Sequence, residues 1–545
     1  MMAYADPEPA TIVPEGLTAD SAVTVKGLDT GDEVTLYKLV EWKNNAENTS
    51  AGWVLTDTFK DDADCQAVLT AINAVTTGVY SLTKDDVAKF TNVINGLSAD
   101  EKAAIALTGA AVNNGASTTS VETGMYLALV KPAVAGTLYN PIIVSADYLQ
   151  PDPETNVIDA SKAELATGFA KKETLRVDKE QEDKNDTPPD GTNNSYNVGD
   201  TVSFTVKTTI PTFAEGYKDP KFKVTDSLST GLVLTTGTVH VYNTDSNAEI
   251  ATLTGVVDEN GTSGWTLDVP SSYISALEAP QPITIKYDAV LTESAFTNVN
   301  EETNDVDVEF SNNPNDENDK GHVDDKTRTY TFSIDGKLLG LGGKDTSELV
   351  KVAVDGNGNP ILQSTSTNTT YKHALEGAIF GLYTDSAATV PYVNGTNKDF
   401  ENIRTDSDGF MEINGLEEGT YYLKELTAPS GFIKDQKIHT IEISANYGEE
   451  TLTNDDGYEY KVPVLTDYTI TIDGVGTSIY NMTLEESKIT TSEIVEASNS
   501  LLNNTKGVEL PSTGGVGTTL FYIIGAVLVL GAGVLLVTRR RVNAN

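Results

Sequence analysis

Residues 201–206 read Thr-Val-Ser-Phe-Thr-Val, and apolar and polar side chains alternate along the whole stretch. Successive side chains of a β-strand point to opposite faces, so this alternation predicts a strand with one buried face. The pattern recurs on both sides of this stretch, with Gly, Pro and Asn clusters between the runs, and such spacing is typical of an antiparallel sandwich. The further runs are residues 175–179, 237–242, 283–287 and 306–310.

The chain of 545 residues is too long for one core, and a prior of roughly 150 residues per domain suggests three or four domains. We expect a mainly β fold with tandem immunoglobulin-like β-sandwich domains, a mixed β/α N-terminal domain and a C-terminal transmembrane helix. Helical periodicity at residues 64–74 and 84–106 marks the N-terminal domain as mixed. The expected ranges are 6–149 for this domain, 150–172 for a linker, 173–319 and 327–504 for two sandwiches, and 505–545 for a C-terminal signal.

The charge balance limits the partners. The chain has 37 Lys+Arg and 80 Asp+Glu, a formal net charge of -43, which repels phosphate backbones and argues against nucleic acid. Cys65 is the single cysteine, so no intrachain disulfide forms, and with four His we expect no metal site and no cofactor. No Ser-His-Asp spacing or zinc signature is visible, so we expect no enzyme; a surface hydrolase or glycan-binding protein is the distant alternative.

The carboxyl terminus has the composition of a membrane anchor. Residues 520–537 carry no charge, and 18 residues in a helix reach about 27 Å, close to a hydrocarbon core of about 30 Å. Arg539, Arg540 and Arg541 follow, and by the positive-inside rule they keep this end in the cytoplasm and the rest of the chain outside. At the other end, Ala3-Tyr4-Ala5 has the form of a signal-peptidase site, so we expect a truncated export signal and a mature chain from about Asp6.

Leu510-Pro511-Ser512-Thr513-Gly514 precedes the apolar span and the basic tail at 539–541. The three elements in this order resemble the cell-wall sorting signal of Gram-positive surface proteins. The resemblance implies that a sortase cysteine attacks the Thr513 carbonyl, that Gly514 onward is lost, and that an amine then resolves the acyl-enzyme. It therefore implies a protein anchored covalently to peptidoglycan at the cell surface.

Lys179 ends an alternating run, and Asn312 lies on the same strand face as Val306, Val308 and Phe310. On spacing alone, the alternative is a lysine that reaches solvent at the strand end. Residues 177–179, 223–232 and 310–314, however, resemble the middle domain of sortase-assembled backbone pilins. That resemblance implies an intramolecular isopeptide bond from Lys179 to Asn312, with Asp226 as the catalytic acid, and burial would favour the neutral lysine and the protonated acid that the reaction needs.

Residues 419–432 resemble the Tyr-x-Leu-x-Glu-x-x-Ala-Pro-x-Gly-Tyr box of collagen-adhesin B-type domains. The resemblance implies a second isopeptide bond, with Lys351 as the nucleophile and Glu425 as the acid. Its partner should lie in the last strand, where Asn503 and Asn504 are both available; we choose Asn503. An ordinary carboxylate on a strand face is the alternative for Glu425.

Backbone pilins commonly carry a Tyr-Pro-Lys motif that supplies the acceptor lysine of the polymer. Tyr139-Asn140-Pro141 lies in the corresponding region without its lysine, and the linker offers Lys171 and Lys172, with Lys162 nearby. The resemblance implies the shaft subunit of a covalent pilus, whose partners are identical subunits, peptidoglycan, polymerising and housekeeping sortases, minor pilins and a host surface ligand. The alternative is a monomeric wall-anchored adhesin that uses the same domains as a stalk.

Overall fold

The computed structural model describes most of the chain. The described ranges are 21–43, 52–74, 82–148, 163–164, 166–182, 194–214, 219–257, 263–297, 301–313, 316–335, 348–394, 400–485, 488–497, 500–507 and 516–542. The chain divides into two compact units. The first unit comprises residues 1–331, 446–466 and 484–489, and the second comprises 332–445, 467–483 and 490–545.

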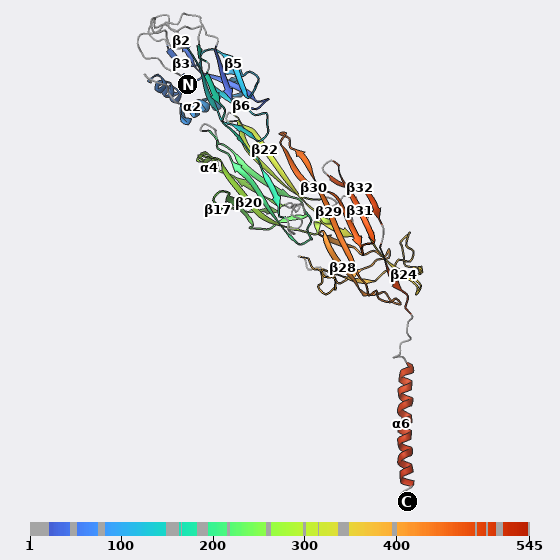
Figure 1. Ribbon diagram of the computed structural model, residues 1–545. Helices are drawn as coiled ribbons and strands as arrows, with labels where there is room; N and C mark the ends of the chain where they lie inside the picture. Colours follow the sequence, from blue (N-terminus) through green and yellow to red (C-terminus); the bar gives the residue numbers. More distant parts are fainter. Residues whose placement is uncertain are drawn as a thin grey trace. The chain divides into compact units, whose positions relative to one another are not determined.

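In its described residues, the N-terminal part of the first unit is a mixed domain of three helices, two larger sheets and the two-stranded pair β11-β7 (Figure 1). The larger sheet has the strand order β3-β2-β6-β8-β9, with β4 paired to β2, and the smaller has the order β10-β1-β5. The strands are β1 Ser21–Lys26, β2 Glu33–Lys43, β3 Gly52–Leu55, β4 Ala106–Thr108, β5 Ala116–Val121, β6 Gly124–Lys131, β7 Thr137–Tyr139, β8 Ile142–Tyr148, β9 Ala163–Glu164 and β10 Ala166–Phe169. The helices are α1 Ala63–Asn73, α2 Lys84–Gly96 and α3 Ala99–Ile105.

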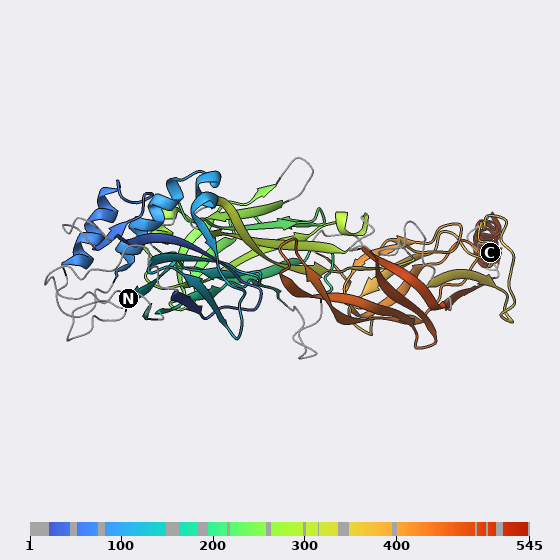
Figure 2. The same ribbon diagram turned by 90° about the horizontal axis from the view of Figure 1, so that it is seen from above.

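The helices α1 and α2 cover one face of the larger sheet (Figure 2). Thr83 and Asp86 form a capping box that satisfies free N–H groups at the start of α2. Phe90 packs edge-on against Phe59 with ring centroids 5.7 Å apart, and Cys65 is buried in the same core. The mixed β/α character predicted for this region is confirmed.

The range 150–172, predicted as a linker, contributes strands to the folded unit. Strand β10 runs parallel to β1, and β11 (Lys172–Thr174) pairs antiparallel with β7. A turn-rich composition did not reveal these short strands, because each gains its stability from a partner that lies far away in the sequence.

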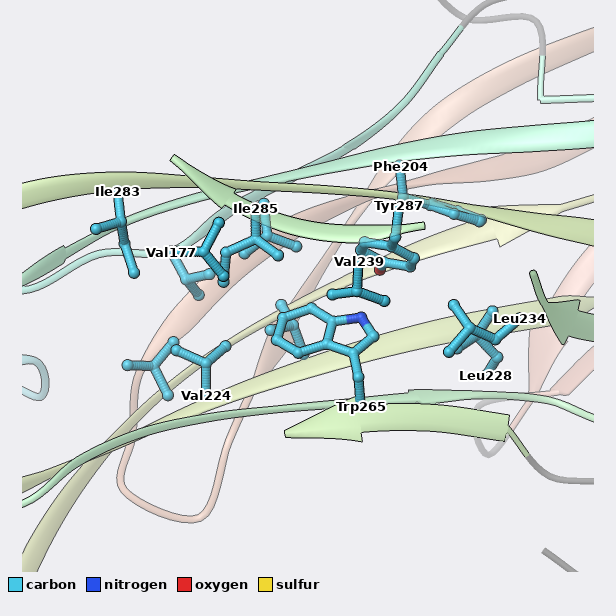
Figure 3. Packing of buried hydrophobic residues seen from close by; sticks show 14 of the residues in the cluster. Val177, Phe204, Val224, Leu228, Leu234, Val239, Trp265, Ile283, Ile285 and Tyr287 are labelled. Carbon is cyan, nitrogen blue, oxygen red and sulfur yellow. The ribbon is translucent and has the colours of Figure 1, made fainter. Parts of the chain in front are cut away.

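The sandwich in the first unit consists of two antiparallel sheets that close on a shared apolar core. One sheet has the order β12-β13-β20-β16-β17, with β15 on β20, and the other has the order β18-β19-β14-β21-β22. Trp265 from the second sheet and Tyr287 from the first face each other across the core with centroids 5.4 Å apart (Figure 3). The strands are β12 Asp178–Gln181, β13 Thr201–Ile210, β14 Phe222–Leu228, β15 Leu232–Leu234, β16 Val239–Asn243, β17 Ala248–Leu253, β18 Val256–Val257, β19 Ser263–Asp268, β20 Gln281–Leu291, β21 Glu302–Asn313 and β22 Asp316–Thr329; two short helices are α4 Ser271–Ser275 and α5 Ser294–Thr297.

This sandwich extends beyond the predicted boundary at residue 319. The polar run 311–319 does not close the domain. It holds the end of β21 and the start of β22, and these two strands pair with each other. Arg328, buried near the end of β22, places its Nη2 atom 2.6 Å from a carboxylate oxygen of Glu450. Residues 446–466 belong to the first unit although they are distant from it in sequence, and this ion pair is one of the contacts that join them to it.

A seven-stranded sheet of order β26-β25-β28-β29-β30-β31-β32 lies mostly in the second unit, although parts of β29 to β32 fall within residues 446–466 and 484–489 of the first. The second unit also has two strand pairs, β23–β27 and β24–β33. The pair β24–β33 is parallel and joins two segments from opposite ends of the unit. All six residues of β24 are buried, so this strand has no solvent-facing side. The strands are β23 Phe332–Ile334, β24 Leu349–Val354, β25 Ile379–Tyr383, β26 Ile403–Arg404, β27 Ile413–Leu416, β28 Gly419–Thr427, β29 Ile438–Thr453, β30 Glu459–Ile472, β31 Gly476–Glu485, β32 Lys488–Ala497 and β33 Ser500–Thr505.

Helix α6 (Val516–Val542) ends the chain, drawn in red in Figure 1. Its segment Tyr522–Arg539 has a mean hydropathy of 2.0 and is long and apolar enough to cross a membrane. The predicted C-terminal apolar helix is confirmed, with bounds somewhat wider than 520–537.

Candidate crosslinking and sorting sites

Lys179 belongs to a buried polar cluster inside the sandwich. Its backbone lies on β12, and its Nζ atom contacts Asp226 Oδ2 on β14 and donates to Asn304 Oδ1 on β21 at 2.7 Å. Strand β12 belongs to one sheet and strands β14 and β21 to the other, so the cluster spans the core. Neither the Lys179 nor the Asp226 side chain is exposed to solvent.

Tyr287 completes this cluster from β20. Its hydroxyl donates to Asp226 Oδ2 at 2.7 Å and accepts from Asn304 Nδ2 at 2.9 Å. The ring packs beside Phe204 and Trp265, and the Lys179 Nζ atom lies 5.6 Å from its centroid. The aromatic rings exclude water, and the hydroxyl holds the acid and the carboxamide in fixed positions.

Burial controls the protonation of this cluster. Desolvation lowers the pKa of Lys179 and raises the pKa of Asp226, although the Coulombic attraction between the two groups opposes both shifts. Both directions favour a neutral amine beside a protonated acid. A neutral amine is a nucleophile and a protonated carboxyl is a proton donor, so burial favours the two species that an attack on a carboxamide needs.

Asn304 occupies the place in which we expected Asn312, and the prediction that Asn312 lies beside Lys179 is wrong. The register of β21 with β22 shifts between Ser311 and Asn313, which interrupts the alternation at Asn312, and the Asn312 Nδ2 atom donates to Asp319 at 3.3 Å. The two asparagines are eight residues apart on β21, which is about 27 Å along a strand. Asn304 pairs with Leu228, two residues from Asp226 on β14, which places it at the level of the acid.

Lys351 lies at the centre of a second cluster, in the second unit. Its Nζ atom is 3.4 Å from Glu425 Oε1 and 5.2 Å from the centroid of Phe380. Asn504 Nδ2 donates to Glu425 Oε2 at 2.9 Å, so the carboxylate lies between the amine and the carboxamide. The side chains of Lys351, Glu425 and Asn504 are buried, and burial lowers the pKa of Lys351.

The register of β24 and β33 distinguishes Asn504 from Asn503. Asn504 pairs with Ala353, whose side chain shares a face with that of Lys351, whereas Asn503 pairs with Val352 on the opposite face. Asn504 is fully buried and Asn503 is exposed. The choice of Asn503 is therefore wrong for this geometry, and the other asparagine of the pair lies at the acid.

Sequence reasoning missed Tyr287. The sequence does indicate that Tyr287 points inward, because residues 283, 285 and 287 share the buried face of an alternating strand. A tyrosine that points into an apolar core needs a partner for its hydroxyl, and that requirement predicts a polar group within the core. Among the lysines that the structure describes, only Lys179 and Lys351 are buried, so the described part of the N-terminal domain contains no comparable cluster.

The linker lysines differ in their surroundings. Lys172 begins β11, pairs with Tyr139 and places its Nζ atom 2.8 Å from both carboxylate oxygens of Asp29. Lys171 is exposed, and its carbonyl accepts from the Asn140 N–H group. Lys162 and the motif Leu510, Pro511, Ser512, Thr513 and Gly514 lie outside the described residues.

Comparisons with known proteins agree with this architecture. Residues 361–458 match the SpaA prealbumin-like fold domain, and residues 503–544 match the LPXTG cell wall anchor motif. The trypsin-resistant surface T6 protein of Streptococcus pyogenes serotype M6 is 25% identical over 575 aligned positions, covering 97% of this chain and 98% of that protein.

Solved structures are similar across most of the chain. The T6 backbone pilin of Streptococcus pyogenes serotype M6, described as a modular three-domain structure, aligns with a TM-score of 0.55 and 18% identity, covering 90% of this chain and all of that one. The full-length major pilin SpaD of Corynebacterium diphtheriae aligns with a TM-score of 0.46 and 15% identity, covering 90% of this chain and 98% of that one. The likeness to the T6 structure shows a shared fold.

Proposed function

We infer that this chain is a backbone pilin, the shaft subunit of a covalently polymerised pilus on a Gram-positive cell surface. The carrying observation is that one chain combines an LPXTG anchor motif with a backbone-pilin fold along nine-tenths of its length. A sortase cuts it between Thr513 and Gly514, and the Thr513 carbonyl is joined to a lysine of the next subunit. The apolar helix holds the precursor in the membrane until that cut.

The two buried clusters support two intramolecular isopeptide bonds, Lys179 to Asn304 and Lys351 to Asn504. In each, the neutral lysine Nζ attacks Cγ of the asparagine, the Nζ–Cγ bond forms, and the Cγ–Nδ2 bond breaks. Nδ2 leaves as ammonia and takes with it the proton that Nζ loses. Asp226 in the first cluster and Glu425 in the second polarise the carboxamide and relay this proton.

Intact-mass spectrometry of the full chain in detergent tests both bonds. We expect the wild type to be lighter than the unmodified chain by two ammonia molecules, and Lys179→Ala and Lys351→Ala each to lose one of these two reductions. Asn304→Ala should behave like Lys179→Ala, with Asn312→Ala as its matched control. Asn504→Ala against Asn503→Ala makes the same comparison for the second bond, and a wild-type mass equal to that of the unmodified chain would exclude both.

The acceptor of the intermolecular bond is proposed to be one lysine of the pair Lys171 and Lys172. The pair lies just after the N-terminal domain, beside the Tyr139-Asn140-Pro141 segment that lacks a lysine of its own. We propose that a polymerising sortase forms these links, that a housekeeping sortase joins the base to peptidoglycan, and that minor pilins and a host ligand complete the set of partners.

A monomeric wall-anchored adhesin is the second candidate, because the Tyr-Pro-Lys motif is interrupted here. Wall extracts boiled in detergent distinguish the two. We expect a ladder of covalent multimers recognised by an antibody to this chain. A single band of monomer released by a wall hydrolase would favour the adhesin instead.

A further inference from the structure

We propose that Asp29 and Lys172 form the acceptor centre of the polymer, with Asp29 holding the Lys172 amine in place and accepting its proton. The proposal deepens the function inferred above and rests on it. It selects Lys172 from the lysine pair. It also gives a role to the carboxylate of Asp29, which lies 143 residues away in the sequence.

The first observation is the register of two short strands. Strand β11 pairs antiparallel with β7, and Lys172 is the direct partner of Tyr139. The Asn140 N–H group bonds to the Lys171 carbonyl at 3.1 Å, which continues the pairing beyond β7. Tertiary structure therefore places a lysine beside the Tyr139-Asn140-Pro141 segment from a neighbouring strand, although the segment itself contains none.

The second observation is that the Lys172 ammonium is held at a defined point. Its Nζ atom lies 2.8 Å from both Oδ1 and Oδ2 of Asp29. The two side chains are 34% and 35% exposed, so the amine is fixed but open to an enzyme. In the part of the chain that the structure describes, no side-chain partner is recorded for Lys171, whose long side chain keeps its rotamer freedom.

The third observation is the support beneath Asp29. Its backbone N–H donates at 2.7 Å to Oδ2 of Asp32, a residue that is 4% exposed. The Tyr139 hydroxyl donates to the same Oδ2 at 2.7 Å, and the Ala133 N–H donates to Oδ1 at 2.8 Å. Asp32 thus ties the turn that carries Asp29 to the tyrosine opposite Lys172. Exposed ion pairs contribute little to stability, so this support beneath Asp29 is better explained by a positioning role than by stabilisation.

The chemistry requires a proton acceptor. A lysine side chain is ordinarily protonated near pH 7, so it must lose a proton before its nitrogen can attack a carbonyl. In the transfer, Asp29 takes one proton from the ammonium, Nζ attacks the Thr513 carbonyl of the acyl-enzyme, the C–N bond forms and the C–S bond breaks. The sortase thiolate leaves and takes the second proton lost by Nζ, and Asp29 releases its proton to water.

The test uses the full chain in a pilus-assembling Gram-positive host, with covalent multimers measured in wall extracts and the junction peptide identified by mass spectrometry. We expect Lys172→Ala to abolish the ladder and leave a wall-anchored monomer, while Lys171→Ala keeps it. Lys207→Ala is the matched control, since it removes another surface lysine that is ion-paired, to Glu180 at 2.7 Å. The wild-type junction should join Thr513 to Nζ of Lys172.

Asp29→Asn tests the carboxylate. With the full chain in detergent and a purified polymerising sortase, we expect a rate about tenfold or more below wild type near pH 7, recovering as the pH approaches that of free lysine ionisation; Asp29→Glu should restore part of the rate at pH 7. An unchanged thermal midpoint shows that folding is intact. A purely structural ion pair would give no such pH profile.

The outcomes separate this proposal from the pilin function. Multimers that persist in Lys172→Ala and disappear in Lys171→Ala, or that are joined at another lysine, overturn the assignment and leave the shaft function standing. A wild-type rate and pH profile in Asp29→Asn overturn the role of the carboxylate alone. Absence of multimers in the wild type overturns the shaft function itself.

Discussion

Burial changes the protonation preference of the lysines and the acid in the two clusters. Lys179 and Asp226 would be a charged pair in water, yet desolvation shifts both of their pKa values toward the neutral forms. Burial also lowers the pKa of Lys351, whose Nζ atom lies 3.4 Å from Glu425 Oε1 inside the second unit. A buried amine with so long a polar contact is costly, and the proposed covalent bond to the adjacent carboxamide would remove that cost.

Tyr287→Phe tests the positioning role of the tyrosine hydroxyl. The substitution keeps the ring that packs on Phe204 but removes the bonds to Asp226 and Asn304. We expect slower formation of the first isopeptide bond, so that fresh protein is a mixture of masses that shifts toward the crosslinked form on storage. Tyr273→Phe is the control, because its hydroxyl bonds to Gln281 on the surface. A fully crosslinked Tyr287→Phe protein at the earliest time point would contradict the role.

At the scale of elements, strand register decides which side chains meet. The pairing of β14 with β21 sets Asn304 near Asp226, and the parallel pairing of β24 with β33 sets Asn504 on the face of Lys351. A shift of one residue in either ladder would turn the asparagine to the opposite face. The correct register of neighbouring strands is therefore needed to assemble each cluster.

Gly264→Ala tests this dependence on register. A Cβ atom at Gly264 in β19 would lie 2.2 Å from the carbonyl oxygen of Asp226 in β14, so the two strands must separate. We expect a loss of about 1–3 kcal/mol in stability and a lower yield of the first crosslink, measured by thermal unfolding and intact mass. Thr266→Ala, an exposed change on the same strand, should leave the crosslink complete. A complete crosslink with unchanged stability in Gly264→Ala would refute the steric argument.

At the scale of the whole molecule, the two proposed crosslinks would determine how the chain carries load. If subunits are joined from Thr513 to Lys172, tension enters the chain after the N-terminal domain and passes through both crosslinks. The first bond bypasses the segment between Lys179 and Asn304, which are 125 residues apart. Tension then cannot extend that segment without breaking an amide, and the resulting resistance is kinetic.

Single-molecule pulling between Lys172 and Thr513 measures this bypass. In the wild type we expect no unfolding step that releases the residues between Lys179 and Asn304, while β22 and the rest of β21 stay in the load path. Lys179→Ala should show a step of about 400 Å, because 125 residues extend by roughly 3.4 Å each. Lys207→Ala is again the control and should behave as wild type. A step of that size in the wild type would show that the bond is absent.

Alternation and local composition were sufficient for the mainly β class, the mixed N-terminal domain and the apolar C-terminal helix, whereas Lys179, Asp226, Lys351 and Glu425 were singled out by the resemblance of short motifs to known domains. These features depend on periodicity or on contiguous residues, so they can be recognised within one segment. The alternation of β21 also predicts that Asn304 shares the inward face of Val306 and Val308, because side chains alternate with a period of two.

The choice of Asn304 over Asn312 and of Asn504 over Asn503 depended on the fold. Alternation specifies a face but not a position along it, and only pairing between distant strands sets the level of one side chain against another. The contacts of Tyr287 with its cluster and of Lys172 with Asp29 have the same origin. Each joins segments far apart in the chain, and their proximity follows from strand pairing and from the closure of the core, which no single segment encodes.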